Sequence, residues 1–222
     1  MLTITAPGPH AGGRILVQGR VESARAAAVL LHGRGATAES ILTLADEIAL
    51  DDVAWLAPQA AGRTWYPYRF LEPVERNEPW LSGALAVVEE IVLGLLGRGF
   101  TADRIGVLGF SQGGCLTLEF AVRHPRPYGA LVALSGGLIG PPGTTWPAPS
   151  DLAGARVFLG CGDRDDHIPV DRVRESSEIF ERTGAEVTAI IYPGMPHIVN
   201  EDELQRVREM FTRMTAARRD GT

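Results

Sequence analysis

The sequence predicts an α/β fold in which helices flank a mostly parallel central sheet, and two observations predict it. Apolar runs alternate with amphipathic stretches along the chain, which is typical of repeated βαβ units. From Ala26 onward the apolar runs are nearly continuous, as expected for strands buried on both faces of a parallel sheet. The pattern predicts strands at residues 15–20, 26–32, 53–57, 105–110, 130–134, 156–161 and 187–192.

Helical periodicity fills the spaces between these strands. It predicts helices at residues 39–50, 79–98, 112–123, 170–182 and 201–216. Asn200 and Glu203 stand in positions close to a capping box at the start of the last helix. Two long connections remain, an aromatic one at residues 63–80 and a Pro/Gly-rich loop at residues 140–150. Long loops inside a compact domain are often functional.

Length and charge limit the classes of protein to consider. The 222 residues suit one domain, 1–222, and a net charge of −6 from 21 basic and 27 acidic residues argues against a nucleic-acid partner. Cys115 and Cys161 lie in apolar stretches and resemble neither a disulfide framework nor a zinc site. The chain has no apolar run of the ~18 residues that a membrane span needs, and the N-terminus does not look like a signal peptide. We therefore expect a cytoplasmic protein without integral membrane association.

The strongest chemical signal is Gly109-Phe-Ser111-Gln-Gly113, which lies between a strand pattern and a helix pattern. A nucleophile on a strand-to-helix turn has a strained backbone, so the residues two positions away must be small. The helix that follows directs its positive dipole end toward developing negative charge. The pentapeptide alone is weak, and a Gly-rich turn with a solvated serine is the alternative. The strand–turn–helix context favours Ser111 as a nucleophile.

A serine nucleophile needs a base and an orienting acid, in the chain order Ser, Asp or Glu, His for this kind of turn. Of the five histidines, only His197 has both this order and a place in the loop after the final strand. Asp165 is the chosen acid in the loop after the preceding strand, with Asp163 and Asp166 as neighbours that cap a helix or hold the loop. The carboxylates here lack the spacing of a calcium or zinc site, so we expect no metal.

The segment after the second predicted strand has two interpretations. Gly33-x-Gly35-x-x-Ala38 matches a dinucleotide-binding fingerprint, but no acidic residue ends the next strand to hold a ribose. The better interpretation is a His-Gly loop whose Arg34 backbone N–H, together with the N–H of Gln112, holds the oxyanion of an acyl-transfer intermediate. This chemistry needs no cofactor.

Taken together, these motifs resemble the phospholipase/carboxylesterase family, which includes the acyl-protein thioesterases. The matching segments begin at His32, Gly109, Leu134, Gly162 and Gly194 and cover most of the chain. The resemblance implies an α/β-hydrolase fold with a minimal or absent cap, and activity on carboxylic esters, lysophospholipids or acyl thioesters. It also implies an acid three residues after Gly162, which is Asp165. Arg34, where the thioesterases commonly have Leu, and the aromatic connection depart from the family pattern, so substrate preference is not carried over.

The aromatic connection is the candidate substrate pocket. Its large side chains predict an apolar lining from Trp65, Tyr66 and Phe70, although ordinary packing over the sheet edge explains them equally well. The resulting hypothesis is a serine esterase that acts on a small-molecule ester, as a monomer or homodimer. A thioesterase, an acyl transferase and a catalytically silent ligand receptor are the alternatives, and the complete set of nucleophile, acid and base argues against the last.

Overall fold

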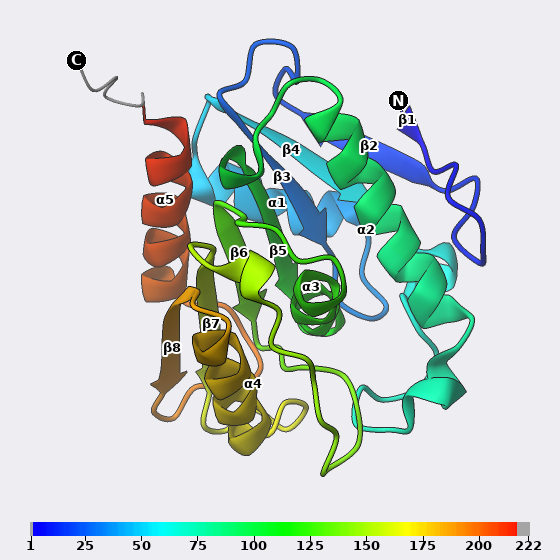
Figure 1. Ribbon diagram of the computed structural model, residues 1–222, viewed down its shortest axis with the longest axis vertical. Helices are drawn as coiled ribbons and strands as arrows, with labels where there is room; N and C mark the ends of the chain where they lie inside the picture. Colours follow the sequence, from blue (N-terminus) through cyan, green and yellow to red (C-terminus); the bar gives the residue numbers. More distant parts are fainter. Residues whose placement is uncertain (1, 217–222) are drawn as a thin grey trace.

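The computed structural model describes residues 2–216 and arranges them around one sheet (Figure 1). Within these residues the strand order is β1-β2-β4-β3-β5-β6-β7-β8. Neighbouring strands from β4 to β8 in this order are parallel. At the other side of the sheet, β1 pairs antiparallel with β2, and β2 pairs antiparallel with β4. The strands are β1 (Leu2–Thr3), β2 (Arg14–Gln18), β3 (Ala26–Leu31), β4 (Val53–Pro58), β5 (Ile105–Phe110), β6 (Ala130–Leu134), β7 (Arg156–Gly162) and β8 (Glu186–Tyr192).

Helices cover both faces of the sheet and create two separate apolar cores. α2 (Trp80–Leu96), α3 (Gln112–Arg123) and α4 (Val170–Arg182) pack on one face (Figure 1). α1 (Ala38–Ile48) and α5 (Glu201–Thr215) pack on the other. Side chains of β3 alternate between these cores, and all six residues of the strand are buried. This confirms the double-sided burial that the continuous apolar runs predicted. No helix within residues 2–216 has the length and apolarity needed to cross a bilayer.

The edge strand β8 is an exception to that prediction. None of its residues is fully buried, because only β7 pairs with it and its outer side has no neighbouring strand. Val187 and Ile191 pack partly against one core and Ile190 partly against the other. The apolar run at 187–192 therefore correctly predicted a strand, but its expected burial was wrong.

Local sequence signals account for several element boundaries. The last helix begins with the capping box that the sequence predicted, in which Asn200 Oδ1 accepts from Glu203 N and Glu203 Oε2 accepts from Asn200 N. The expected aromatic connection contains a 3₁₀ turn, η2 (Val74–Asn77). Between β6 and β7 the only regular structure is another 3₁₀ turn, η4 (Ser150–Leu152), so no helical cap covers the sheet there. The fold is the capless α/β-hydrolase type that the resemblance implied.

Candidate active site

Ser111 occupies the sharp turn between β5 and α3. Its backbone has φ 57° and ψ −119°, a left-handed conformation that costs energy for a residue with a side chain. The turn also brings backbones together: a Cβ on Gly109 would lie 2.1 Å from the Gly113 carbonyl oxygen, and one on Gly113 would lie 1.9 Å from the Leu31 carbonyl oxygen. Both positions therefore require glycine, which is the physical reason for the motif recognised in the sequence.

The structure brings Ser111, His197 and Asp165 into one hydrogen-bonded chain. His197 Nε2 lies 2.9 Å from Ser111 Oγ, and His197 Nδ1 lies 2.6 Å from Asp165 Oδ2. Because a carboxylate only accepts, Nδ1–H donates to Asp165 and Nε2 is left to accept the serine proton. This is the tautomer that a general base needs.

Asp165 is held as a buried carboxylate. Its side chain is fully buried, and Oδ1 accepts from the backbone N–H groups of His167 at 2.8 Å and Ile168 at 3.0 Å. Burial alone would raise the pKa of Asp165, but the hydrogen bonds from His197 and these two amides outweigh it and hold the pKa below its ordinary value. Asp165 is therefore ionised in the folded protein at neutral pH.

The two neighbouring aspartates have different positions. Asp163 Oδ1 accepts from Gly194 N at 2.6 Å, which ties the loop after β7 to the loop after β8 that carries His197. Asp166 is exposed, and its side chain makes no hydrogen bond or ion pair within residues 2–216. Neither caps α4, which begins after Pro169 without a side-chain cap.

The imidazole of His197 contacts two other rings. Phe110 lies 4.8 Å away between ring centroids, and His167 meets it edge-on at 4.6 Å. His167 projects from the loop of Asp165, so this loop both orients His197 through its carboxylate and limits its rotation through a second imidazole. The side chain of His197 remains 19% exposed, which leaves a path for substrate and water.

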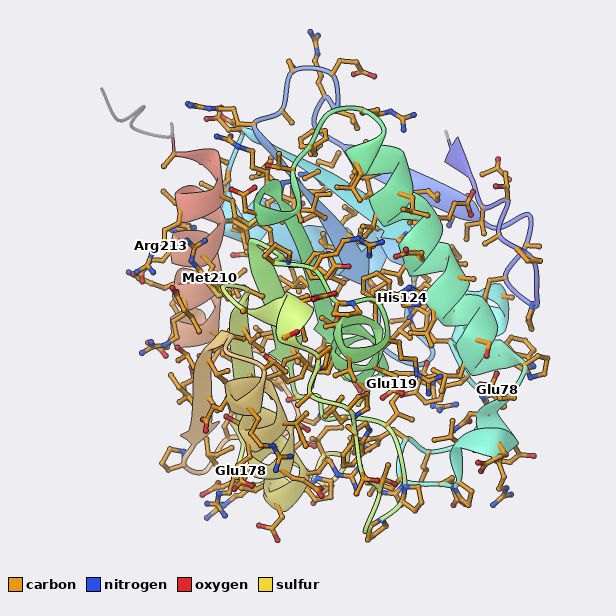
Figure 2. All side chains as sticks on the ribbon, viewed as in Figure 1. Glu78, Glu119, His124, Glu178, Met210 and Arg213 are labelled. Carbon is orange, nitrogen blue, oxygen red and sulfur yellow. The ribbon has the colours of Figure 1, made fainter. Side chains whose placement is uncertain are left out.

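The side chains of the three remaining histidines make no hydrogen bond, ion pair or ring contact with Ser111, His197 or Asp165 within residues 2–216. His124 is at the end of α3 (Figure 2). Its Nδ1 lies 3.5 Å from Glu89 Oε2. His32 accepts from Ala60 N, and burial lowers its pKa, so it is a neutral core residue. His10 lies near the N-terminus but is also a buried residue. It is 1% exposed and packs between Trp65 and Trp80, where burial lowers its pKa.

A cavity of about 350 Å³ opens directly over Ser111 and His197. Tyr66 and Phe70 line it, as the sequence predicted, together with Phe110 and Ile168. Trp65 does not line it, which corrects the predicted pocket. It is fully buried beneath the cavity, where Nε1–H donates to the carbonyl oxygen of His32 at 2.9 Å. A buried indole N–H needs a hydrogen-bond acceptor, and the His32 carbonyl oxygen supplies it here.

Arg34 and Gln112 also border this cavity, as expected for an oxyanion site. The backbone N–H of neither residue donates to any group within residues 2–216. Gln112 is the first residue of α3, so its N–H also lies at the positive end of the helix dipole. Two backbone donors beside Ser111 are thus free to bind an oxygen atom of a ligand.

The side chains of these two residues have a role that the sequence reasoning missed. Gln112 Oε1 accepts from Trp65 N at 2.9 Å, and its Nε2 donates to the Tyr66 carbonyl oxygen at 2.8 Å. Arg34 donates to the carbonyl oxygens of Pro67 and Tyr68. Both side chains therefore fix the aromatic connection to the loops around Ser111. A polar side chain at the buried start of an apolar helix was the signal available in the sequence.

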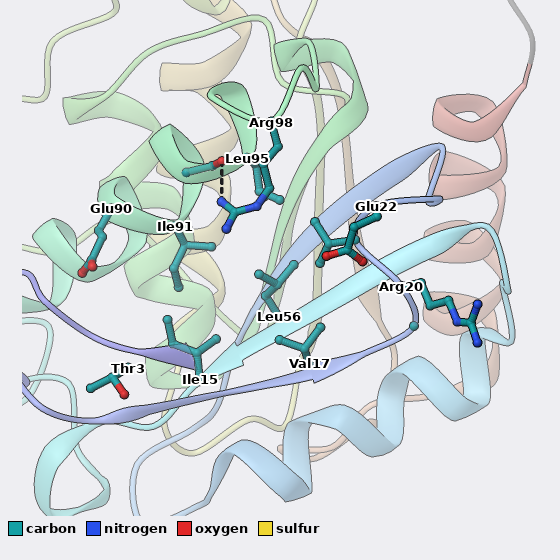
Figure 3. A pocket seen from close by; sticks show the side chains of 13 residues that line it. Thr3, Ile15, Val17, Arg20, Glu22, Leu56, Glu90, Ile91, Leu95 and Arg98 are labelled. Carbon is teal, nitrogen blue, oxygen red and sulfur yellow. Dashed lines mark hydrogen bonds between the residues drawn. The ribbon is translucent and has the colours of Figure 1, made fainter. Parts of the chain in front are cut away.

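A second cavity, of about 420 Å³, lies between α2 and the β2–β4 edge of the sheet (Figure 3). Ile15, Val17 and Leu56 face Ile91 and Leu95 across it, and Arg98 Nη1 donates to the Gly94 carbonyl oxygen. Its lining contains no serine, cysteine or histidine. Unlike the cavity over Ser111, this second cavity has no serine or cysteine nucleophile and no histidine base.

Comparisons with a family model, with solved structures and with known sequences agree on one family. The family model described as Phospholipase/Carboxylesterase matches residues 14–215. The crystal structure of a phospholipase/carboxylesterase from Dyadobacter fermentans is 41% identical, covers 93% of this chain and 99% of its own, and superimposes with a TM-score of 0.86. Carboxylesterase SOBER1 of Arabidopsis thaliana is 22% identical, over 86% of this chain and 91% of its own. Acyl-protein thioesterase 1 of Neurospora crassa is 23% identical, over 84% and 86% respectively. The chain belongs to the phospholipase/carboxylesterase family and is a hydrolase that acts on esters.

Proposed function

We propose that the protein hydrolyses carboxylic esters through an acyl-enzyme on Ser111, with His197 as the base and Asp165 as its orienting acid. The observation that carries this proposal is the unbroken chain of hydrogen bonds from Ser111 Oγ through both nitrogens of His197 to Asp165. The serine end of this hydrogen-bonded series opens to the cavity, whereas the Asp165 side chain at its other end is fully buried. That asymmetry is what acyl transfer requires.

In the first half of the reaction, Ser111 Oγ attacks the acyl carbonyl carbon while His197 Nε2 takes the hydroxyl proton. The imidazolium formed is stabilised by the Asp165 carboxylate, and it then protonates the departing alcohol. In the second half, His197 takes a proton from water while the water oxygen attacks the acyl carbonyl carbon. The bond between the acyl carbon and Ser111 Oγ then breaks, the imidazolium returns its proton to Ser111 Oγ, and the acid leaves.

Both halves pass through a tetrahedral intermediate whose oxygen carries negative charge. The N–H groups of Arg34 and Gln112 are suited to stabilise it, because they are free, lie beside Ser111 and need no rearrangement. No step uses a metal or an organic cofactor. A thioester fits the same site, because only the leaving atom changes, so a thioesterase is the second candidate and is supported by the named relatives.

Ser111→Ala tests the proposal directly. Loss of a triad serine typically reduces kcat by about 10⁶-fold, so hydrolysis of 4-nitrophenyl butanoate by the variant should fall to the background rate. Thioester and ester substrates of matched chain length, run in parallel, separate the two candidates. Ser82→Ala, which changes an exposed serine of α2, is the matched control and should keep wild-type turnover.

A fluorophosphonate probe provides an independent measurement, because it reacts with activated serines whatever the natural substrate is. Mass spectrometry should find the label on the peptide that contains Ser111 and on no other. Labelling of another serine, or full turnover in Ser111→Ala, would show that the nucleophile is wrong. Folded protein that neither reacts with the probe nor hydrolyses any ester would instead favour the silent receptor.

A further inference from the structure

The cavity over Ser111 has a charge that the composition does not predict. The chain carries a net charge of −6, yet none of the residues that line this cavity is an aspartate or a glutamate. The lining includes two arginines, Arg34 and Arg69, and a second histidine, His167, beside His197. Asp165 is separated from the cavity by His197 and is fully buried. The charged side chains that line the cavity are therefore basic, in a chain that is negatively charged overall.

The two arginines differ in how their guanidinium groups are used. Arg34 donates through Nη1 to Thr64 Oγ1 and the Pro67 carbonyl oxygen, and through Nη2 to the Tyr68 carbonyl oxygen. The N–H groups of its guanidinium are thus used largely in hydrogen bonds within the protein. The Arg69 side chain is exposed and makes no hydrogen bond or ion pair within residues 2–216. Its planar set of N–H donors remains open to an external acceptor.

The backbone that carries Arg69 is nevertheless well fixed. The side chain of buried Asn77 accepts from Tyr68 N at 2.9 Å and donates to the Arg69 carbonyl oxygen at 3.3 Å. On the other side, Phe70 is buried and its carbonyl oxygen accepts from Gly140 N at 2.8 Å. An unpaired guanidinium on an anchored backbone loses less freedom on binding than one on a mobile loop.

We propose that the enzyme prefers esters that carry a carboxylate, and that Arg69 is the residue that binds it. This inference rests on the proposed function, since it assigns a substrate class to the same site. Guanidinium and carboxylate pair through two parallel hydrogen bonds, and the nearby charge of Arg34 adds to the attraction. The apolar wall of Tyr66, Phe70 and Phe110 takes the hydrocarbon part of the ester. A cavity of about 350 Å³ suits a small molecule of this kind.

Two pairs of substrates test the inference, each pair differing only by carboxylate against carboxamide. One pair places the group on the leaving alcohol, as in 4-(butanoyloxy)benzoate and 4-(butanoyloxy)benzamide. The other places it at the far end of the acyl chain, as in the 4-nitrophenyl esters of adipic acid and of its monoamide. Wild-type kcat/KM, corrected for the rates in alkali, should favour the carboxylate by roughly tenfold in at least one pair.

Variants then assign the preference to a residue. Arg69→Gln should abolish the ratio between the carboxylate and the carboxamide, mainly through KM, whereas Arg69→Lys should keep part of it because the charge remains. Arg63→Gln is the matched control, because Arg63 is exposed on the same connection but does not line the cavity, and it should keep the wild-type ratio.

The possible failures are distinguishable. If wild type hydrolyses the esters but shows no carboxylate preference in either pair, the substrate class is wrong and the proposed function stands. If a preference exists and Arg69→Gln retains it, the role of Arg69 is wrong. If no ester is hydrolysed by folded protein, the proposed function fails and this inference fails with it.

Discussion

Two regions that border the cavity are held in place by different means. The aromatic connection is fixed by burial: Trp65 and Tyr66 are almost fully inaccessible, and side chains of Arg34, Gln112 and Asn77 bind its backbone. The acid and base loops, after β7 and β8, are largely exposed and are joined by individual hydrogen bonds such as Asp163 to Gly194 and Asp165 to His197. Damage to the first region should therefore reduce stability, and damage to the second should reduce activity.

The largest expected effect concerns the exposed region. Asp165→Asn keeps the shape and can still accept from the two backbone amides, but it no longer holds His197 in the required tautomer. We expect a loss of kcat of about 10³–10⁴-fold with little change in the urea midpoint. Asp166→Asn is the matched control and should behave as wild type, because its side chain has no partner within residues 2–216. A comparable loss in Asp163→Asn or Asp166→Asn would contradict the assignment of the acid.

The next effect concerns the buried region. Trp65→Ala removes a fully buried indole and its hydrogen bond to the His32 carbonyl oxygen, so we expect a loss of about 3–5 kcal/mol in the free energy of unfolding. Tyr68→Ala, three positions along the same connection, changes a side chain that is 46% exposed and should cost less than about 1 kcal/mol. Urea unfolding followed by tryptophan fluorescence and circular dichroism measures both. Equal losses in the two variants would show that burial does not fix this connection.

The smallest effect is a pH dependence of stability from Glu203, which belongs to the capping box of α5 just after the loop of His197. Its side chain is fully buried, Oε1 has no hydrogen-bond partner, and burial raises its pKa to about 7, against the hydrogen bond from Asn200 N. A folded-state pKa above the unfolded value means that the native state binds this proton more tightly. Stability from this group is therefore complete below about pH 4.5 and is lost as pH rises through about 7.

Glu203→Gln should remove that dependence while preserving the capping box, in which glutamine also serves. The variant should gain about 2 kcal/mol relative to wild type between pH 5 and pH 8. Urea unfolding of both proteins at the two pH values gives the difference directly. Parallel stability profiles for wild type and variant would mean that Glu203 does not ionise in the folded protein over this range.

Much of this arrangement was predictable because it depends on short segments. Gly109 had to be glycine because of the Gly113 carbonyl oxygen four residues along, so the turn around Ser111 was recognisable. The matching requirement at Gly113 comes from the Leu31 carbonyl oxygen on the neighbouring strand β3, and only the tertiary structure shows that contact. The capping box at Asn200 is equally local. The positions of His10 and Trp65 were not predictable, because each depends on partners far away in the chain. His10 is buried by Trp65 and Trp80, and Trp65 is held by His32.

The sequence by itself determined the order of strands and helices and the strained turn at Ser111, because periodicity and turn chemistry depend on residues that are close together in the chain. It also determined the candidate acid and base, through their order and their places in the loops after strands. Only the tertiary structure decided which aromatic side chains form the cavity, which arginine is left unpaired and how Asp165 and His197 meet. Those outcomes depend on packing and hydrogen bonds between residues as distant as Ser111 and His197, whose approach is set by the parallel sheet that brings the ends of β5, β7 and β8 to the same edge.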